Sequence, residues 1–175
     1  MSATLLSVSG LSTHIDSENG LVRALDCVSF DVSAGETFAL LGESGCGKSV
    51  TALSLMRLLP PGGSVAAGSV VLDGQDLCAL TEAEMRRVRG AGMAMIFQEP
   101  GTSLNAVLTV GQQIGEVLAL HRGLRGAAAD REAVALMTQV GIPDPQRRLR
   151  EYPFQLSGGM KQRVMIAMAL AGEPR

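Results

Sequence analysis

The sequence has few aromatic residues, and this scarcity argues against one large class of function. It contains no Trp, one Tyr (Tyr152) and four Phe among 175 residues. Proteins that bind single-stranded nucleic acid stack bases on aromatic side chains, and nucleic-acid-binding domains usually carry an excess of positive charge. The formal net charge here is -2. We therefore expect no nucleic acid among the partners.

Long apolar runs and paired cysteines are also missing. The longest apolar stretch, residues 164–172, falls well short of the roughly 18 residues that a membrane-spanning helix needs. The first ten residues lack the basic start and apolar block of a secretory signal. The three cysteines, Cys27, Cys46 and Cys78, form no C-x-x-C pair and are odd in number, as is usual in a reducing compartment. We therefore expect a cytoplasmic protein.

Short apolar segments predict several strands. Apolar and polar residues nearly alternate in residues 3–13 and 22–33, which favours half-buried strands. Residues 37–41 (TFALL) and 93–97 (MAMIF) are almost continuously apolar, a pattern typical of strands buried on both faces. The length of the chain is enough for one domain with a hydrophobic core.

Helices are predicted from capping patterns and from glycine or proline stops. Thr81 with Glu84, and Thr109 with Gln112, have the spacing of capping boxes, in which two side chains cap each other's backbone N–H groups. The predicted helices are residues 48–59, the segment from Thr81 to Gly90, the segment after Thr109, residues 127–140 and residues 158–171. Residues 69–72 predict a short strand, followed by a tight turn at Asp73-Gly74.

A glycine-rich loop follows residues 37–41 directly. Residues 42–49 read GESGCGKS, in which glycines permit a tight turn that points backbone N–H groups inward. The positive N-terminal end of the next helix adds to this concavity, so it favours phosphate. Lys48 would reach the β- and γ-phosphates, and Ser49 would place its hydroxyl on Mg²⁺. The residues predicted to hold ATP are Gly42, Glu43, Ser44, Gly45, Cys46, Gly47, Lys48 and Ser49.

A second candidate anion site begins the last predicted helix. Residues 156–164 read LSGGMKQRV. Ser157 is a favourable N-cap, and Gly158 and Gly159 leave the first helical turn bare. From these residues alone, a plain helix start is as good an interpretation as an anion site.

Taken together, the motifs resemble those of the ABC ATPases in type, order and spacing. They are GESGCGKS, then IFQEP at residues 96–100, then LSGGMKQRV. The closer similarity is to the ATP-binding subunits of dipeptide and oligopeptide importers. The strings that carry it are MIFQEPGTSLNAVLTVGQQI (95–114), VGIPDPQRRL (140–149) and YPFQLSGGMKQRVMIAMAL (152–170).

The resemblance implies a fold and a division of the chain. It implies an α/β P-loop core with an N-terminal antiparallel β subdomain and an inserted helical subdomain, of which the C-terminal part is missing here. Residues 1–100 would form the ATP-binding core, with the β subdomain, the phosphate loop (residues 42–49) and the Q-loop (the segment around Gln98). Residues 101–157 would form the helical subdomain. Residues 158–175 would form the signature helix, named after the LSGGMKQRV signature motif (residues 156–164), and would return to the truncated core.

The resemblance also implies roles and partners. Two such domains stack head to tail, so Ser157, Gly158, Gly159 and Gln162 would face the ATP held by the partner. Gln98 would be the Q-loop glutamine, a catalytic residue that positions water and, with Ser49, contacts Mg²⁺. The expected partners are transmembrane permease subunits, docked on the helical stretch, and a second ABC ATPase subunit of the same or a different kind. This places the protein at the inner face of the cell membrane.

Three positions depart from the family pattern. Ile15, beside His14, stands where an aromatic residue usually stacks on adenine, a contact that is worth about 1–3 kcal/mol. Glu99 replaces the usual Asp, which keeps the carboxylate. After Gly172 the sequence shows none of the family's later strand ending in Asp-Glu, its D-loop or its switch histidine. Because Asp73 belongs to a predicted turn before the Q-loop, it does not replace them.

We therefore expect the ATP-binding subunit of an ABC transporter that imports peptides or a related small solute. The family is an ATPase family, whereas this chain alone should bind Mg-ATP weakly and turn it over negligibly. Two alternatives stay open: a non-catalytic fragment that docks on a transporter membrane subunit, and an ABC ATPase with no role in transport.

Overall fold

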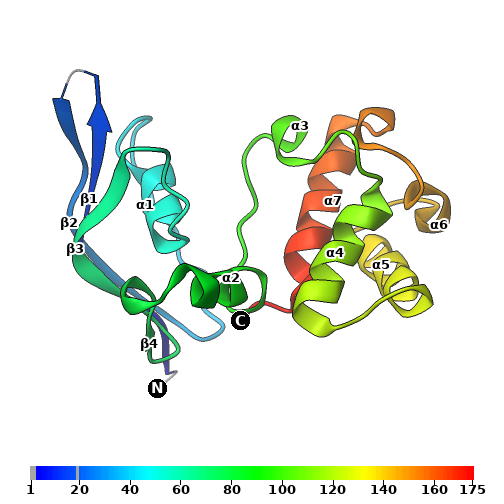
Figure 1. The fold of residues 1–175 in the computed structure, drawn as a ribbon, viewed down its shortest axis with the longest axis horizontal. Coiled ribbons are helices and arrows are strands. Elements are labelled where there is room, and N and C mark those ends of the chain that lie inside the picture. Colours follow the sequence, from blue (N-terminus) through cyan, green and yellow to red (C-terminus); the bar gives the residue numbers. More distant parts are fainter. Residues whose placement is uncertain (1–2, 19) are drawn as a thin grey trace. The chain divides into compact units, whose positions relative to one another are not determined.

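The computed structural model describes residues 3–18 and 20–175 (Figure 1). The chain divides into two compact units, Met1–Met85 and Arg86–Arg175. The first unit is built on a four-stranded antiparallel sheet with strand order β2-β1-β3-β4. Its elements are β1 (Thr4–Ser17), β2 (Gly20–Ser33), α1 (Lys48–Leu55), β3 (Gly63–Leu72), β4 (Gln75–Asp76) and the 3₁₀ turn η1 (Leu77–Ala79).

The sheet confirms the strands predicted near the N-terminus and extends them. Val8 of β1 lies opposite Phe30 of β2 and Val70 of β3, and Val8 and Val70 are buried. The predicted turn at Asp73-Gly74 is also present, because Asp73 (φ 48°) and Gly74 (φ 79°) both adopt left-handed backbone angles between β3 and β4. Such paired positive φ angles join two antiparallel strands tightly.

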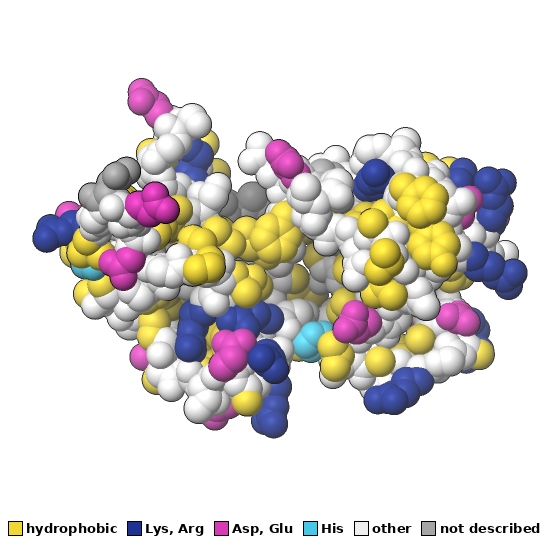
Figure 2. Space-filling view, turned by 45° about the horizontal axis from the view of Figure 1, so that its top comes forward, with side chains coloured by type: hydrophobic (Ala, Val, Ile, Leu, Met, Phe, Trp, Pro, Cys, Tyr) yellow, Lys and Arg dark blue, Asp and Glu magenta, His cyan; other side chains and the backbone are white. Residues whose placement is uncertain are grey.

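The two strands predicted to be buried on both faces are absent, and this prediction was wrong. The structure assigns no strand to residues 37–41, where the Leu41 side chain is 88% exposed. Residues 94–97 are likewise irregular, and Met93 makes only an isolated bridge to Arg89. Ile96 and Phe97 are exposed, and apolar side chains are visible on the surface in Figure 2. A strand needs neighbouring strands to satisfy its backbone groups, and no strand of the described residues pairs with either segment.

The helix after the glycine loop is shorter than predicted. Helix α1 ends at Leu55, not at residue 59, and Met56 is its C-cap. The next residue, Arg57, has a φ of 50°, which a right-handed helix cannot accommodate. Its Nη1 donates hydrogen bonds to the carbonyl oxygens of Leu77 and Leu80, and these bonds hold the chain at the point where the helix stops.

Helices dominate the second unit, which takes in the last part of α2. They are α2 (Glu82–Ala91), α3 (Pro100–Ser103), α4 (Val110–Arg122), α5 (Ala127–Gln139), α6 (Pro145–Arg148), the 3₁₀ turn η2 (Pro153–Gln155) and α7 (Gly158–Ala171). Helices α4, α5 and α7 pack around one core that includes Ile114, Leu118, Met137 and Val164, all fully buried. None of the helices in the described residues is both long and apolar enough to cross a membrane.

Both predicted capping boxes are confirmed. Thr109 accepts a hydrogen bond from the Gln112 backbone N–H, and the Gln112 side chain accepts one from the Thr109 backbone N–H. The same exchange occurs between Thr81 and Glu84 before α2. Helix α7 has the predicted bounds, and Gln162 and Arg163 are exposed on it. The division of the chain at residues 100 and 157 stays a prediction.

Candidate nucleotide-binding site

The glycine-rich loop turns into α1 at Gly47, where only glycine fits. Gly47 is the N-cap of α1, with a φ of 94°, a conformation that side chains disfavour. A Cβ atom at this position would lie 2.9 Å from Cδ2 of Leu25 and 3.0 Å from the carbonyl oxygen of Ala24. The loop therefore rests directly on β2, and this contact fixes where α1 begins.

Lys48 folds back across the loop. Its Nζ donates hydrogen bonds to the carbonyl oxygens of Gly42 (2.7 Å) and Glu43 (2.6 Å), and it lies 3.4 Å from Sγ of Cys46. The ammonium group thus lies at the centre of the loop. Phosphate oxygens would form stronger hydrogen bonds with this ammonium group than neutral carbonyl oxygens do, because their negative charge assists the bond.

The remainder of the loop suits an anion. Residues 42–46 and Ser49 are exposed, and the first turn of α1 contains no acidic side chain that would repel a phosphate. Backbone N–H groups at a helix N-terminus bind phosphate readily. Ser49 is an exposed residue in the first turn of α1, and Mg²⁺ commonly combines few protein ligands with substrate phosphates and water. The residues present therefore fit a Mg-nucleotide, with Ser49 as the candidate metal ligand.

The signature segment opens α7 in the predicted way. Ser157 is the N-cap, and its Oγ accepts a hydrogen bond of 3.3 Å from the Met160 backbone N–H. Gly158 and Gly159 are exposed, and a Cβ at either would meet no atom within 4 Å. Gln162 is exposed one turn further on. The first turn of α7 contains no acidic side chain, so this helix start is also open to an anion.

Gln98 lies in the irregular segment between α2 and α3 and is exposed. The backbone carbonyl of its neighbour Glu99 accepts hydrogen bonds from the hydroxyls of Thr102 and Ser103, which hold the first turn after Gln98. The phosphate loop belongs to the first unit, whereas Gln98 and the signature belong to the second. The metal and catalytic roles of Gln98 stay predictions.

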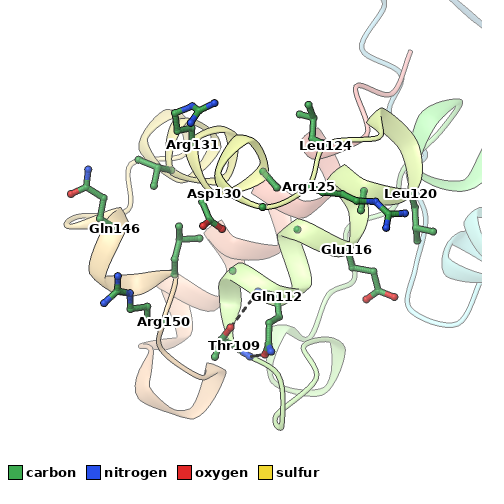
Figure 3. A pocket seen from close by; sticks show the side chains of 17 residues that line it. Thr109, Gln112, Glu116, Leu120, Leu124, Arg125, Asp130, Arg131, Gln146 and Arg150 are labelled. Carbon is green, nitrogen blue, oxygen red and sulfur yellow. Dashed lines mark hydrogen bonds between the residues drawn. The ribbon is translucent and has the colours of Figure 1, made fainter.

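A groove of about 970 Å³ opens on the second unit between α4, α5 and α6 (Figure 3). Its apolar lining includes Leu124, Val134 and Leu149. The charged and polar side chains at the groove are Thr109, Gln112, Glu116, Arg125, Asp130, Arg131, Gln146 and Arg150. Such a combination of an apolar surface with a polar rim suits an amphipathic helix.

Buried Gln113 holds the loop at one end of this groove. Its Oε1 accepts a hydrogen bond from the Asn105 backbone N–H (2.9 Å), and its Nε2 donates to the carbonyl oxygens of Asn105 and Leu108 (both 3.1 Å). These bonds fold the loop against α4, next to the capping residue Thr109. The sequence pattern did not predict this role, because Gln113 is the second of two adjacent glutamines and gives no local signal of its own.

A glycine-rich loop that follows an antiparallel β subdomain and suits a phosphate chain, together with an open LSGG helix start, is the pattern of a P-loop ATP-binding cassette. The sequence profile of the ABC transporter family matches residues 25–175, so the chain belongs to that family. This confirms the resemblance that the motifs carry.

Among the curated proteins that match the chain are transport ATP-binding proteins. The dipeptide transport ATP-binding protein DppD of Bacillus subtilis is 52% identical over 171 residues, which are 97% of this chain and 51% of DppD. The peptidoglycan transport ATP-binding protein YejF of Agrobacterium fabrum is 51% identical over 172 residues, or 98% of this chain and 32% of YejF. The chain therefore spans about half, or less, of the length of these curated relatives.

A solved structure has the same fold. The dimeric, post-hydrolysis cassette MJ0796, bound to ADP and Pi, has a TM-score of 0.85 and 25% identity, covering 97% of this chain and 71% of that one. The predicted α/β fold of a partial ABC ATPase core is thereby confirmed.

Proposed function

We propose that the chain is the ATP-binding part of an ABC importer subunit, and that residues 42–49 hold Mg-ATP. The observation that carries this proposal is the position of Lys48 Nζ, 2.7 Å from the carbonyl oxygen of Gly42 at the centre of an exposed loop. Lys48 would bind the β- and γ-phosphates, the loop N–H groups would bind the remaining phosphate oxygens, and Ser49 would complete the metal site.

The signature acts on the nucleotide of a second subunit in this proposal. Ser157, Gly158, Gly159 and Gln162 are exposed at the start of α7, so they are free to meet a phosphate that a partner presents. The dimeric state of the MJ0796 cassette supports a dimer, and we propose that its two subunits stack head to tail. The partner is either a second copy of this protein or a related ATPase subunit.

The groove on the second unit would receive the membrane subunit. We propose that a short cytoplasmic helix of a permease lies between α4 and α5, with its apolar side on Leu124 and Val134. This docking places the protein at the inner face of the cell membrane, where it would energise the uptake of peptides or a related small solute. The transport roles in the names of DppD and YejF support this solute class.

Hydrolysis would take place at the nucleotide held by the phosphate loop. Phosphoryl transfer depends on positioned charge and metal, and Gln98 would position the attacking water and Mg²⁺ there. Residues 1–175 by themselves are expected to bind Mg-ATP without appreciable turnover.

A lysine substitution tests the proposal. Lys48→Ala should abolish binding of Mg-ATP, measured by equilibrium titration with a fluorescent ATP analogue. The matched control is Lys161→Ala, which removes the only other lysine of the chain from outside the phosphate loop and should leave the affinity of one subunit unchanged. Binding that survives in Lys48→Ala would place the nucleotide elsewhere.

A further inference from the structure

The helix that carries Lys48 and Ser49 is held against the sheet by polar side chains. Helix α1 has eight residues, and its buried residues are Thr51 and Ser54. The Thr51 hydroxyl is used inside the same segment, because it donates to the Gly47 carbonyl oxygen. A helix of this length is not stable by itself, so the position of its N-terminus depends on what it contacts in the sheet.

The contact is a buried chain of hydroxyl groups. Ser54 Oγ donates a hydrogen bond to the Val50 carbonyl oxygen (2.7 Å) and lies 2.8 Å from Thr13 Oγ1 of β1. A serine hydroxyl has a single hydrogen, so Thr13 must be the donor to Ser54. Thr13 is 0% exposed and Ser54 is 1% exposed, and the hydrogen bond between their hydroxyl groups is therefore protected from water.

The other end of α1 rests on the neighbour of Thr13. Thr13 pairs across the sheet with Leu25 of β2, and Leu25 is the side chain that packs against Gly47. One cross-strand pair thus holds both the start of α1, through Gly47, and its last turn, through Ser54. Small shifts of the helix along this pair would move Lys48 and the exposed N–H groups of the loop.

We infer that Thr13 and Ser54 are positioning residues for the phosphate loop. Their hydrogen bond fixes α1 on the sheet so that the loop N–H groups and Lys48 converge on one phosphate chain. Removing either hydroxyl leaves a polar group unpaired in a buried site, which is unfavourable, and the helix regains freedom at its last turn. The loss of affinity should come from the contacts with the phosphates and not from contacts with the base. This inference rests on the proposed nucleotide site.

The test compares two ligands on the purified full-length protein. Dissociation constants are measured for Mg-ATP and for inorganic triphosphate with Mg²⁺, well below the unfolding temperature, so that a mere loss of stability leaves them unchanged. The variants are Thr13→Val and Ser54→Ala, each alone and combined, with Thr13→Ser as the conservative change that keeps the hydroxyl. Thr4→Val, at an exposed position of the same strand, is the matched control.

Thr13→Val and Ser54→Ala should each weaken both ligands by the same factor, about three- to tenfold for the loss of one buried hydrogen bond. The double variant should be no weaker than the singles, and Thr13→Ser and Thr4→Val should bind like the wild type. If Thr13→Val does not fold, Ser54→Ala decides the question from the helix side.

Unchanged affinities in folded Thr13→Val and Ser54→Ala would overturn the inference and leave the site itself intact. A wild-type protein that binds neither ligand would overturn the proposed site and this inference with it.

Discussion

Arg163 of α7 donates a hydrogen bond of 2.6 Å from Nη1 to the carbonyl oxygen of Gly141, and a longer one of 3.3 Å to that of Val140. These carbonyls close the C-terminal end of α5, where a positive charge is favourable. The signature helix is thereby tied to a helix that lines the groove. Gly141 has a φ of 74°, and a Cβ there would lie 2.7 Å from Nη1 of Arg163.

This contact predicts an order of stabilities. Arg163→Ala should lower the free energy of unfolding by about 1 kcal/mol, because a short and a long hydrogen bond are lost near the surface. Gly141→Ala should lower it further, since it adds about 1–2 kcal/mol of left-handed backbone strain and displaces the guanidinium. Urea unfolding measures both. The free energy of unfolding of Arg131→Ala, an exposed change on α5, should stay within about 0.5 kcal/mol of the wild-type value. A loss in Arg131→Ala equal to that in Arg163→Ala would show that the contact with Gly141 is not the cause.

The three cysteines should differ in their rates of alkylation. Burial raises the pKa of the Cys78 thiol, with a smaller contribution from the nearby charge of Asp76, so less of it is the reactive thiolate near neutral pH. Cys27 and Cys46 are exposed and should react first with iodoacetamide. The rates are read by mass spectrometry of digested samples.

ATP should protect only one of them. Cys46 lies inside the phosphate loop, so a bound triphosphate would cover it, whereas Cys27 lies in β2 and serves as the internal control. Alkylation of Cys46 should also block nucleotide binding. Labelling of Cys46 at the same rate with and without saturating ATP would contradict its placement beside the phosphates.

A bulky side chain in the groove should separate docking from nucleotide binding. Gly115 of α4 lines the groove, and a Cβ there would meet nothing within 4 Å. Gly115→Phe should therefore fold, keep its affinity for Mg-ATP, and lose co-purification with the permease subunits. Ala135→Phe places the same ring at an exposed position of α5 outside the groove and should still co-purify. Retention of the permease by Gly115→Phe would rule out this groove as the docking surface.

Elements with local signals could be predicted from the sequence. The capping boxes at Thr109 and Thr81 and the turn at Asp73-Gly74 depend on side chains within a few residues, and the structure confirms all three. The strands predicted at residues 37–41 and 93–97 failed because a strand depends on distant partners, and a local apolar pattern does not supply them. Helix α1 ended early because Arg57 is held by distant carbonyls of Leu77 and Leu80.

In the candidate site, too, the features with local sequence signals could be predicted and those that depend on distant residues could not. Its residue types and order were readable in GESGCGKS and LSGG, because these motifs are continuous in the sequence. The sequence did not indicate that Lys48 folds back across its own loop. It also did not indicate the contact of α1 with Thr13, since Thr13 and Ser54 are 41 residues apart. Thr13 and Ser54 are small polar residues, and no local pattern indicates that they pair.

The most direct measurement is a crystal structure of the protein with Mg²⁺ and a non-hydrolysable ATP analogue. We expect density for the triphosphate against residues 42–49, with Lys48 Nζ moved from the Gly42 carbonyl to the β- and γ-phosphate oxygens and Ser49 Oγ on the metal. A triphosphate bound at any other place, with Lys48 still on its own loop, would contradict it.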